Sequence, residues 1–145
     1  MTKIKPRMTK ILEFEYIVAD WYNPDGDIHP IVPVILRHRD RSVQTMALVD
    51  SGADMNVMPF HIGMELGLSW ERTANDFELH GLAEILAAKA VAVDLAIGSW
   101  PTLRMAFAWS RQDETPVILG QWNFFGEVNV CFSRSQGLMT FELPQ

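Results

Sequence analysis

The residues best suited to chemistry lie in the stretch ALVDSGADMNVMP, residues 47–59. An apolar run leads directly into Asp50, Ser51 and Gly52, which predicts a carboxylate buried at the end of a strand. A buried carboxylate is costly unless it is hydrogen-bonded, paired or protonated, and strongly perturbed acids gather at functional sites. Asp-Ser-Gly is also common in turns, because Asp and Ser bond nearby backbone amides and Gly adopts positive φ. The tripeptide alone therefore leaves a turn and a catalytic carboxylate both open.

The surrounding pattern predicts a mostly β protein. Alternating or fully apolar runs of strand length occupy residues 11–17, 30–38, 43–50, 89–97, 102–109 and 115–121, and a hairpin of residues 128–132 and 138–143 closes the chain. Two prolines in 30–38 favour an edge strand or a bulge over the centre of a sheet. Residues 59–68 predict a short helix, with Pro59 in its first turn and Gly67 at its end, and residues 122–128 predict a helical turn. We expect one domain over residues 21–145, preceded by an N-terminal extension or strand over residues 1–20.

Composition excludes several classes of function. The chain has 145 residues and a formal net charge of -6, which argues against broad binding to a phosphate backbone, because such binding requires clustered Lys and Arg on one face. The basic residues near the start (Lys3, Lys5, Arg7 and Lys10) indicate a solvated end. The longest apolar segment, residues 83–98, contains Lys89 and Asp94 and is shorter than the ~20 residues of a membrane helix. We therefore expect no nucleic-acid or membrane partner.

The single cysteine, Cys131, cannot form a disulfide within the chain, which favours a cytoplasmic protein. In the apolar context NVCF it is expected to be a small buried residue rather than a nucleophile. The four histidines (His29, His38, His61 and His80) lack the spacing of metal ligands, and Asp113 and Glu114 lie in a charged loop where we expect solvent exposure. We expect no metal and no cofactor.

Two motifs together resemble the retropepsin-like aspartic proteases. The first is Asp50-Ser51-Gly52-Ala53 after an apolar strand, and the second is the later Ile118-Leu119-Gly120. The order between them is also similar, because a short helix, a hairpin flap and paired strands separate the two motifs. The likeness covers about residues 30–143. It implies a closed β-barrel of the retropepsin-like acid protease type with one or two short helices.

The resemblance also implies a mechanism and a partner. In such enzymes two aspartates share one proton, because two like charges about 3 Å apart do not both ionise readily, and they activate a water between them. This chain has one Asp-Ser-Gly, so the dyad requires Asp50 from each of two copies in a homodimer that cleaves a peptide or protein substrate. The resemblance gives Ser51, Gly52, Ala53 and Gly120 the role of supporting the active-site loop.

Asp54 is a candidate either for substrate contact or for a loop cap. Further substrate contacts are expected from the tip of a flap over residues 78–89; the flap candidates are His80, Gly81, Leu82, Ala83 and Glu84. Many retroviral relatives carry an Arg after the second motif, which pairs with the acid at the position of Asp54. Gln121 stands there in this chain, so either a hydrogen bond replaces the ion pair or Asp54 mainly meets substrate amides.

A different class of function also fits the residues. The flap contains only Gly81, whereas flaps in the family are commonly rich in glycine, so a catalytically silent dimerisation or peptide-binding module is the alternative. Retention of Asp-Ser-Gly-Ala favours the protease, because a binding module has no need of a costly carboxylate pair. A serine nucleophile is disfavoured, since Ser51 has no His nearby in the sequence.

Overall fold

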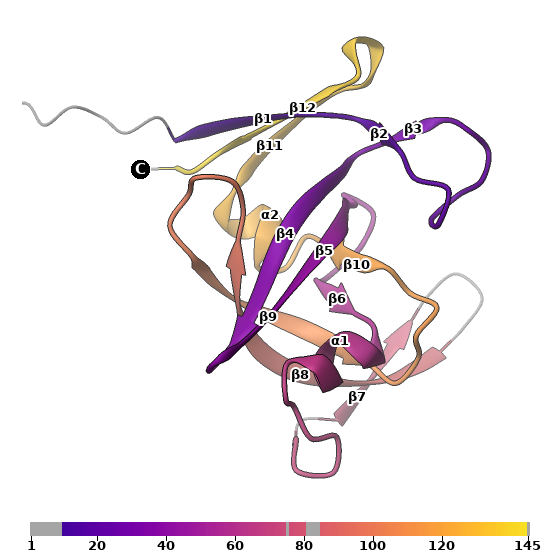
Figure 1. The fold of residues 1–145 in the computed structure, drawn as a ribbon, viewed down its shortest axis with the longest axis vertical. Helices are drawn as coiled ribbons and strands as arrows, with labels where there is room; N and C mark the ends of the chain where they lie inside the picture. The colour runs from indigo at the N-terminus through magenta and orange to yellow at the C-terminus, as the bar shows by residue number, and fades with distance from the viewer. Residues whose placement is uncertain (1–9, 75, 81–84, 145) are drawn as a thin grey trace, which may run out of the picture.

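The computed structural model describes residues 10–74, 76–80 and 85–144, and Figure 1 shows their arrangement. The elements follow in the order β1 (Ile11–Glu15), β2 (Ile17–Val18), β3 (Ile28–His29), β4 (Ile31–His38), β5 (Arg41–Val49), β6 (Val57–Met58), α1 (Phe60–Glu65), β7 (Asp76–His80), β8 (Ile85–Ala96), β9 (Leu103–Ser110), β10 (Val117–Leu119), α2 (Phe124–Glu127), β11 (Asn129–Ser133), the 3-10 turn η1 (Arg134–Gln136) and β12 (Leu138–Glu142). The predicted strands and both short helices are present, with shifted ends.

The main sheet closes on itself. Its seven strands lie in the order β4-β5-β10-β6-β9-β8-β7, and an additional antiparallel pairing joins β4 to β8. This last pairing, Ile35 with Ala96 through Arg37 with Asp94, joins the two sides of the sheet into a ring (Figure 1). Such closure leaves fewer unpaired strand edges. The mostly β, closed architecture with two short helices is therefore confirmed.

β4 shows why Pro33 is tolerated within a strand, whereas Pro30 lies just before it. Pro33 pairs with Met46 of β5, whereas the pairing of β4 with β8 covers Ile35 to Arg37. Pro33 is exposed and lies outside that second pairing, so its missing N–H costs no hydrogen bond to β8. Of the two predicted alternatives, an edge or a bulge, the edge position holds for the part of β4 around Pro33, whereas Ile35 to Arg37 pair on both sides.

The alanine-rich segment forms the long strand β8. Val91, Val93 and Leu95 are buried, while Ala92 between them is exposed, so burial follows the period of two that the sequence shows. The strand begins at Ile85, four residues earlier than predicted, because its first half pairs with β7 in a hairpin. The expected flap region is therefore the β7–β8 hairpin.

Lys89 holds the base of this hairpin. Its side chain is only 10% exposed, and its ammonium donates to the carbonyl oxygens of Trp70 and Thr73, the latter at 2.8 Å. Asp76 lies 3.4 Å away, and the ring of Trp70 lies 4.8 Å from the ammonium. A buried charge is tolerated only with such partners. Lys89 thus fixes the loop before β7 against β8.

A second, three-stranded sheet has the order β1-β12-β11, so the N-terminal strand extends the C-terminal hairpin. Its inner face contributes Phe14 and Phe141 to the core. Their ring centroids are 5.3 Å apart, and Phe141 also packs on Phe124 of α2.

None of the helices in the described part of the chain is long and apolar enough to cross a membrane.

The expected burial of Cys131 is wrong. Cys131 is exposed on β11, an edge strand of the three-stranded sheet, where it pairs with Thr140, which in turn pairs with Glu13. These three residues share one face, and the exposure of Glu13 and Cys131 marks that face as solvent-facing. The apolar letters around the cysteine did not reveal which face of the strand is covered.

Candidate active site

The structure brings the two apolar motifs side by side. β5 and β10 run parallel, with Leu48 opposite Ile118 and Val49 opposite Leu119. Beyond the last pair, the Asp50 N–H donates to the carbonyl oxygen of Leu119 at 3.0 Å. β6 pairs with β10 on its other side, so β10 lies between the strand that enters the Asp50 loop and the strand that leaves it. Asp50 therefore stands where the chain leaves a buried strand pair.

The Asp50 carboxylate organises its own loop. Oδ1 accepts a hydrogen bond from the Gly52 N–H at 2.9 Å, and the Asp50 carbonyl accepts one from the Ala53 N–H at 3.2 Å. These are the hydrogen bonds of the turn that Asp-Ser-Gly predicts. Asp50 is half-buried rather than buried, and Ser51 and Gly52 are exposed. Within one chain the carboxylate thus keeps an open side, because the loop lies at the surface.

Gly120 is required by a close backbone approach. A Cβ added there would lie 2.5 Å from the carbonyl oxygen of Met55 and 2.8 Å from that of Ala53. Real Cβ atoms do not come so near to backbone oxygen, and backbone cannot move aside as a flexible side chain can. The glycine therefore lets the end of β10 pack directly on the loop that carries Asp50.

Gln121 and Trp122, which follow Gly120, hold the same loop through hydrogen bonds to its backbone. The Gln121 N–H donates to the carbonyl oxygen of Ala53 at 2.8 Å, and its side-chain amide donates to that of Ser51 at 2.7 Å. The Trp122 N–H donates to the carbonyl oxygen of Asp54 at 2.8 Å. A hydrogen bond to the loop backbone thus takes the place of an ion pair, and it goes to Ser51. Asp54 is exposed, and within the described ranges its carboxylate has no hydrogen-bond or ionic partner.

Asn56 is a supporting residue that the sequence did not single out. It is fully buried, and its Oδ1 accepts from the Gly120 N–H at 2.9 Å while its Nδ2 donates to the Ala106 carbonyl oxygen at 3.2 Å. The Asn56 carbonyl oxygen also accepts from the Ala108 N–H at 2.8 Å. Asn56 therefore joins the Gly120 turn to β9. The only sequence signal was a lone amide among apolar residues in MNVMP.

Replacing Asn56 with Leu is expected to destabilise the protein by about 1–3 kcal/mol, because the buried N–H of Gly120 would lose its acceptor. Chemical denaturation measures this loss. Asn129→Leu, on the exposed start of β11, is the matched control and is expected to change stability by less than about 0.5 kcal/mol. Equal losses in both variants would contradict the role of Asn56.

The flap candidates are only partly described. His80 ends β7, pairs with Ile85 across the hairpin and is exposed, with Nε2 3.7 Å from a carboxylate oxygen of Glu78. Gly81, Leu82, Ala83 and Glu84 lie outside the described residues. Their proposed contacts with substrate stay a prediction.

Two carboxylates outside the Asp50 loop have lowered pKa values. Asp113 and Glu114 are exposed, as expected, and Asp113 accepts from the backbone N–H of His61 at 2.8 Å, which holds the pKa of Asp113 below its usual value. The pKa of Asp27 is lowered chiefly by the Ile28 N–H, with a further contribution from Arg134. Across residues 10–74, 76–80 and 85–144, no three His, Cys, Asp or Glu side chains are placed to hold a metal ion.

Comparison with known proteins identifies the architecture. No family model and no curated protein sequence matches the chain. Among solved structures, it is similar to a retropepsin-like aspartic protease from Rickettsia conorii, with a TM-score of 0.63 over 97% of this chain and 98% of that chain, at 14% identity. The parallel β5–β10 pair, the Gly120 contact and this likeness agree: the chain has the retropepsin-like fold.

Proposed function

We propose that the protein is an aspartic endopeptidase whose catalytic pair is formed by Asp50 of two copies in a homodimer. The observation that carries the proposal is the position of Asp50, held at the end of β5 by the Leu119 carbonyl while its carboxylate keeps an open side. A single chain supplies one Asp-Ser-Gly, so the second carboxylate has to come from a symmetric partner.

In the proposed mechanism, one carboxylate takes a proton from a water held between the pair, and this water attacks the scissile carbonyl carbon. The other carboxyl, which is protonated, donates its proton to the carbonyl oxygen. The two groups exchange roles when the tetrahedral intermediate breaks and the leaving amine takes up a proton. Because the carboxylates are coupled, their titrations belong to the pair.

The loop is built to hold this geometry. The Asp50 Oδ1 is already fixed by the Gly52 N–H at 2.9 Å, and Gln121 and Trp122 restrain Ser51, Ala53 and Asp54 through three further hydrogen bonds. Fixed donors around a reacting carboxylate lower the cost of reorganisation during the reaction. We propose an extended peptide as substrate, enclosed by the β7–β8 hairpin, with Asp54 meeting its backbone amides. The lone cysteine keeps the cytoplasm as the proposed compartment.

The experiment that tests this function is cleavage of an unbiased peptide library by the full chain, with sedimentation of the same samples. A dimer that cleaves peptides, and loses activity on dilution below its dissociation constant, is the expected result. A folded dimer that cleaves no peptide from about pH 4 to pH 7 would favour a silent binding module. A strict monomer would overturn the proposed dyad.

Trp122 gives a direct test of the dimer. It is 66% exposed beside the Asp50 loop, to which its N–H is bonded through Asp54. Exposed tryptophans are favoured anchors of interfaces, so Trp122→Ala is expected to weaken dimerisation by about 2 kcal/mol or more, roughly 30-fold in dissociation constant. Analytical ultracentrifugation measures the change. Met64→Ala, which removes an exposed apolar side chain from α1 outside this loop, is the control, and an equal effect would contradict the assignment.

A further inference from the structure

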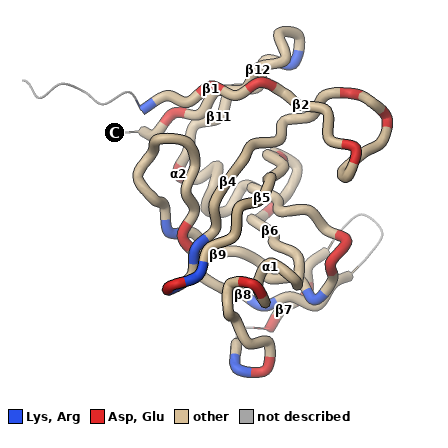
Figure 2. The backbone as a smooth tube through the Cα atoms, viewed as in Figure 1, with Lys and Arg blue, Asp and Glu red and all other residues tan. Residues whose placement is uncertain are grey.

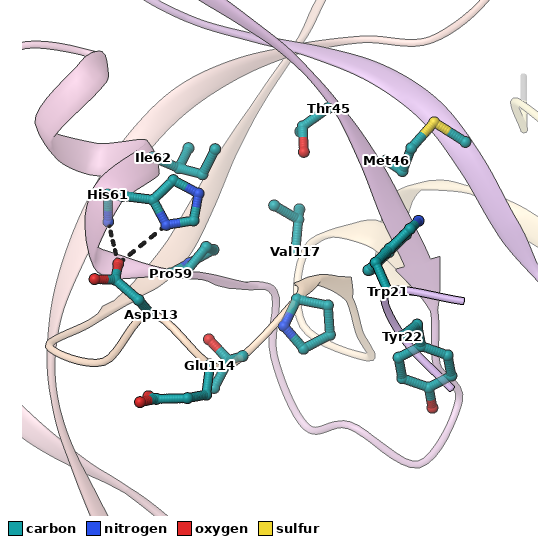
Figure 3. Close-up of a pocket in the computed structure, with 12 residues that line it drawn as sticks. Trp21, Tyr22, Thr45, Met46, Pro59, His61, Ile62, Asp113, Glu114 and Val117 are labelled. Carbon is teal, nitrogen blue, oxygen red and sulfur yellow. Dashed lines mark hydrogen bonds and ion pairs between the residues drawn. The ribbon is translucent and has the colours of Figure 1, made fainter. Parts of the chain in front are cut away.

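A pocket of about 390 Å³ lies apart from the Asp50 loop (Figure 3). It is bounded by the segment after β2, the middle of β5, the start of α1 and the loop that precedes β10, and Asp50 does not line it. Figure 3 shows Trp21 and Tyr22 on one side and Asp113 and Glu114 on the other, with Val117 between them. The proposed catalytic mechanism uses none of these side chains.

The pocket has the chemistry of a cation site. Trp21 is 57% exposed and Tyr22 is 39% exposed, so both rings are open to a ligand. Among the residues that the structure describes, the pocket is lined by two carboxylates, Asp113 and Glu114, and by no Lys or Arg. A cation is attracted both to the face of an aromatic ring and to a carboxylate.

The two carboxylates differ in their engagement. Asp113 accepts from the backbone N–H of His61 at 2.8 Å and lies 3.0 Å from its Nδ1, so it also fixes the first turn of α1. The nearby cation Arg111 stacks instead on the ring of Phe60, with its guanidinium carbon 4.0 Å from the ring centroid. Glu114 forms no ion pair with any residue in the described part of the chain. Glu114 is therefore free to bind an external cation.

The chain itself contains a segment of matching chemistry. In Thr2-Lys-Ile-Lys-Pro-Arg-Met8 the cations stand at positions 3, 5 and 7, and the apolar residues alternate with them. In extended backbone such alternation places the cations on one face and the apolar side chains on the other. The pocket offers carboxylates and aromatic rings together with apolar side chains such as Ile62 and Val117. Figure 2 shows acidic residues in the segment between β2 and β3 and in the loop before β10.

The distance that the N-terminal segment can span favours a segment from another copy. In Figure 1 the start of β1, where this segment joins the fold, and the segment after β2, which lines the pocket, lie at opposite ends of the stretch formed by β1 and β2. Nine residues span at most about 30 Å, and a segment of the same chain would have to turn back along β1 to arrive. We propose that the pocket binds residues 2–8 of a second copy of the chain, so that two copies exchange their basic N-terminal segments. This contact is independent of catalysis at Asp50.

Paramagnetic NMR tests the exchange on the full chain. All samples carry Asp50→Asn, which prevents self-cleavage, and Cys131→Ser, which removes the exposed thiol. A spin label is placed at Thr2→Cys in unlabelled protein, which keeps all three cations, and this protein is mixed with ¹⁵N-labelled chains that carry no spin label. We expect selective broadening of the amide signals of Trp21, Glu114 and Val117 in the ¹⁵N chains, and its reversal by high salt.

A matched pair of variants checks the chemistry. Glu114→Gln in the ¹⁵N chain is expected to reduce the broadening several-fold, whereas Glu127→Gln on α2, an exposed acid outside the pocket, is expected to leave it unchanged. Replacing Lys3, Lys5 and Arg7 together by Gln in the spin-labelled chain is expected to abolish it. Glu114 is chosen because Asp113 supports α1, so its loss would disturb the fold.

Each alternative result overturns the proposal. Broadening only when one ¹⁵N chain itself carries the spin label would show binding within a single chain. Broadening centred on another surface, or none above that of free spin label, would show that the pocket does not hold this segment. A cleaving dimer with no such broadening would leave the proposed protease function intact while removing the exchange.

Discussion

Replacing Asp50 with Asn is expected to lower peptide cleavage by about 10²- to 10⁴-fold or more, because an amide cannot take a proton from the attacking water. The Asn side chain keeps an oxygen at the Oδ1 position, so it can still accept from the Gly52 N–H at 2.9 Å and hold the loop. The variant is therefore expected to remain folded and dimeric. Initial rates on the best library peptide, with sedimentation of both proteins, measure the effect.

Asp40→Asn is the matched control, since Asp40 lies exposed in the turn between β4 and β5, outside the site, and its replacement is expected to leave cleavage unchanged. Mixing wild type with excess Asp50→Asn provides a second test. The mixed dimers would contain one carboxylate each, so activity per wild-type chain is expected to fall. Full activity of a dimeric Asp50→Asn, or of the mixture after exchange of chains, would contradict the shared dyad.

Gly120→Ala is expected to have the second large effect. Its Cβ would lie 2.5 Å from the Met55 carbonyl oxygen and 2.8 Å from that of Ala53, so the loop that carries Asp50 would have to move. Overpacking of this kind costs about 1–3 kcal/mol, and displacement by about 1 Å lowers catalysis by roughly 10²-fold. Denaturation curves and cleavage rates, measured below the unfolding transition, report the two losses separately.

Gly126→Ala provides the matched control on α2. A Cβ there would meet the Gln121 carbonyl oxygen at an ordinary contact distance of 3.8 Å, and Ala in place of Gly within a helix is expected to stabilise the protein by about 0.5–1 kcal/mol. If Gly120→Ala has the stability of the wild type and cleaves peptides at the wild-type rate, the close approach of backbone at Gly120 contributes neither to stability nor to catalysis.

The periodic patterns of the sequence were sufficient for the longer strands of the sheets and the two short helices, but not for the two-residue strands β3 and β6. β8 shows this best, since the alternation of valine and leucine with smaller residues over 91–95 reappears as alternating burial. The position of Asp50 at a strand end also follows from local order, because an apolar strand runs directly into a turn-forming tripeptide. Both features depend on neighbours in the sequence, which the chain fixes through side-chain periodicity and turn chemistry.

Features that depend on distant contacts were missed. Asn56 contacts Gly120 and Ala106, which lie far away in the sequence, and Gln121 bonds the Ser51 carbonyl rather than Asp54. Cys131 was expected to be buried because its neighbours are apolar, yet it lies on the uncovered face of an edge strand. Local composition does not say which face of a strand another element covers.

The sequence by itself therefore determined most of the longer strands, the two short helices and the acid at the end of β5. The tertiary structure decided what surrounds that acid: the parallel pairing of β5 with β10, the Gly120 contact on the loop, and the open side of the Asp50 carboxylate. It also assembled the pocket of Trp21, Asp113 and Glu114 from segments far apart in the chain. Side-chain periodicity acts over a few residues, whereas these sites arise only when the closed sheet brings distant segments together.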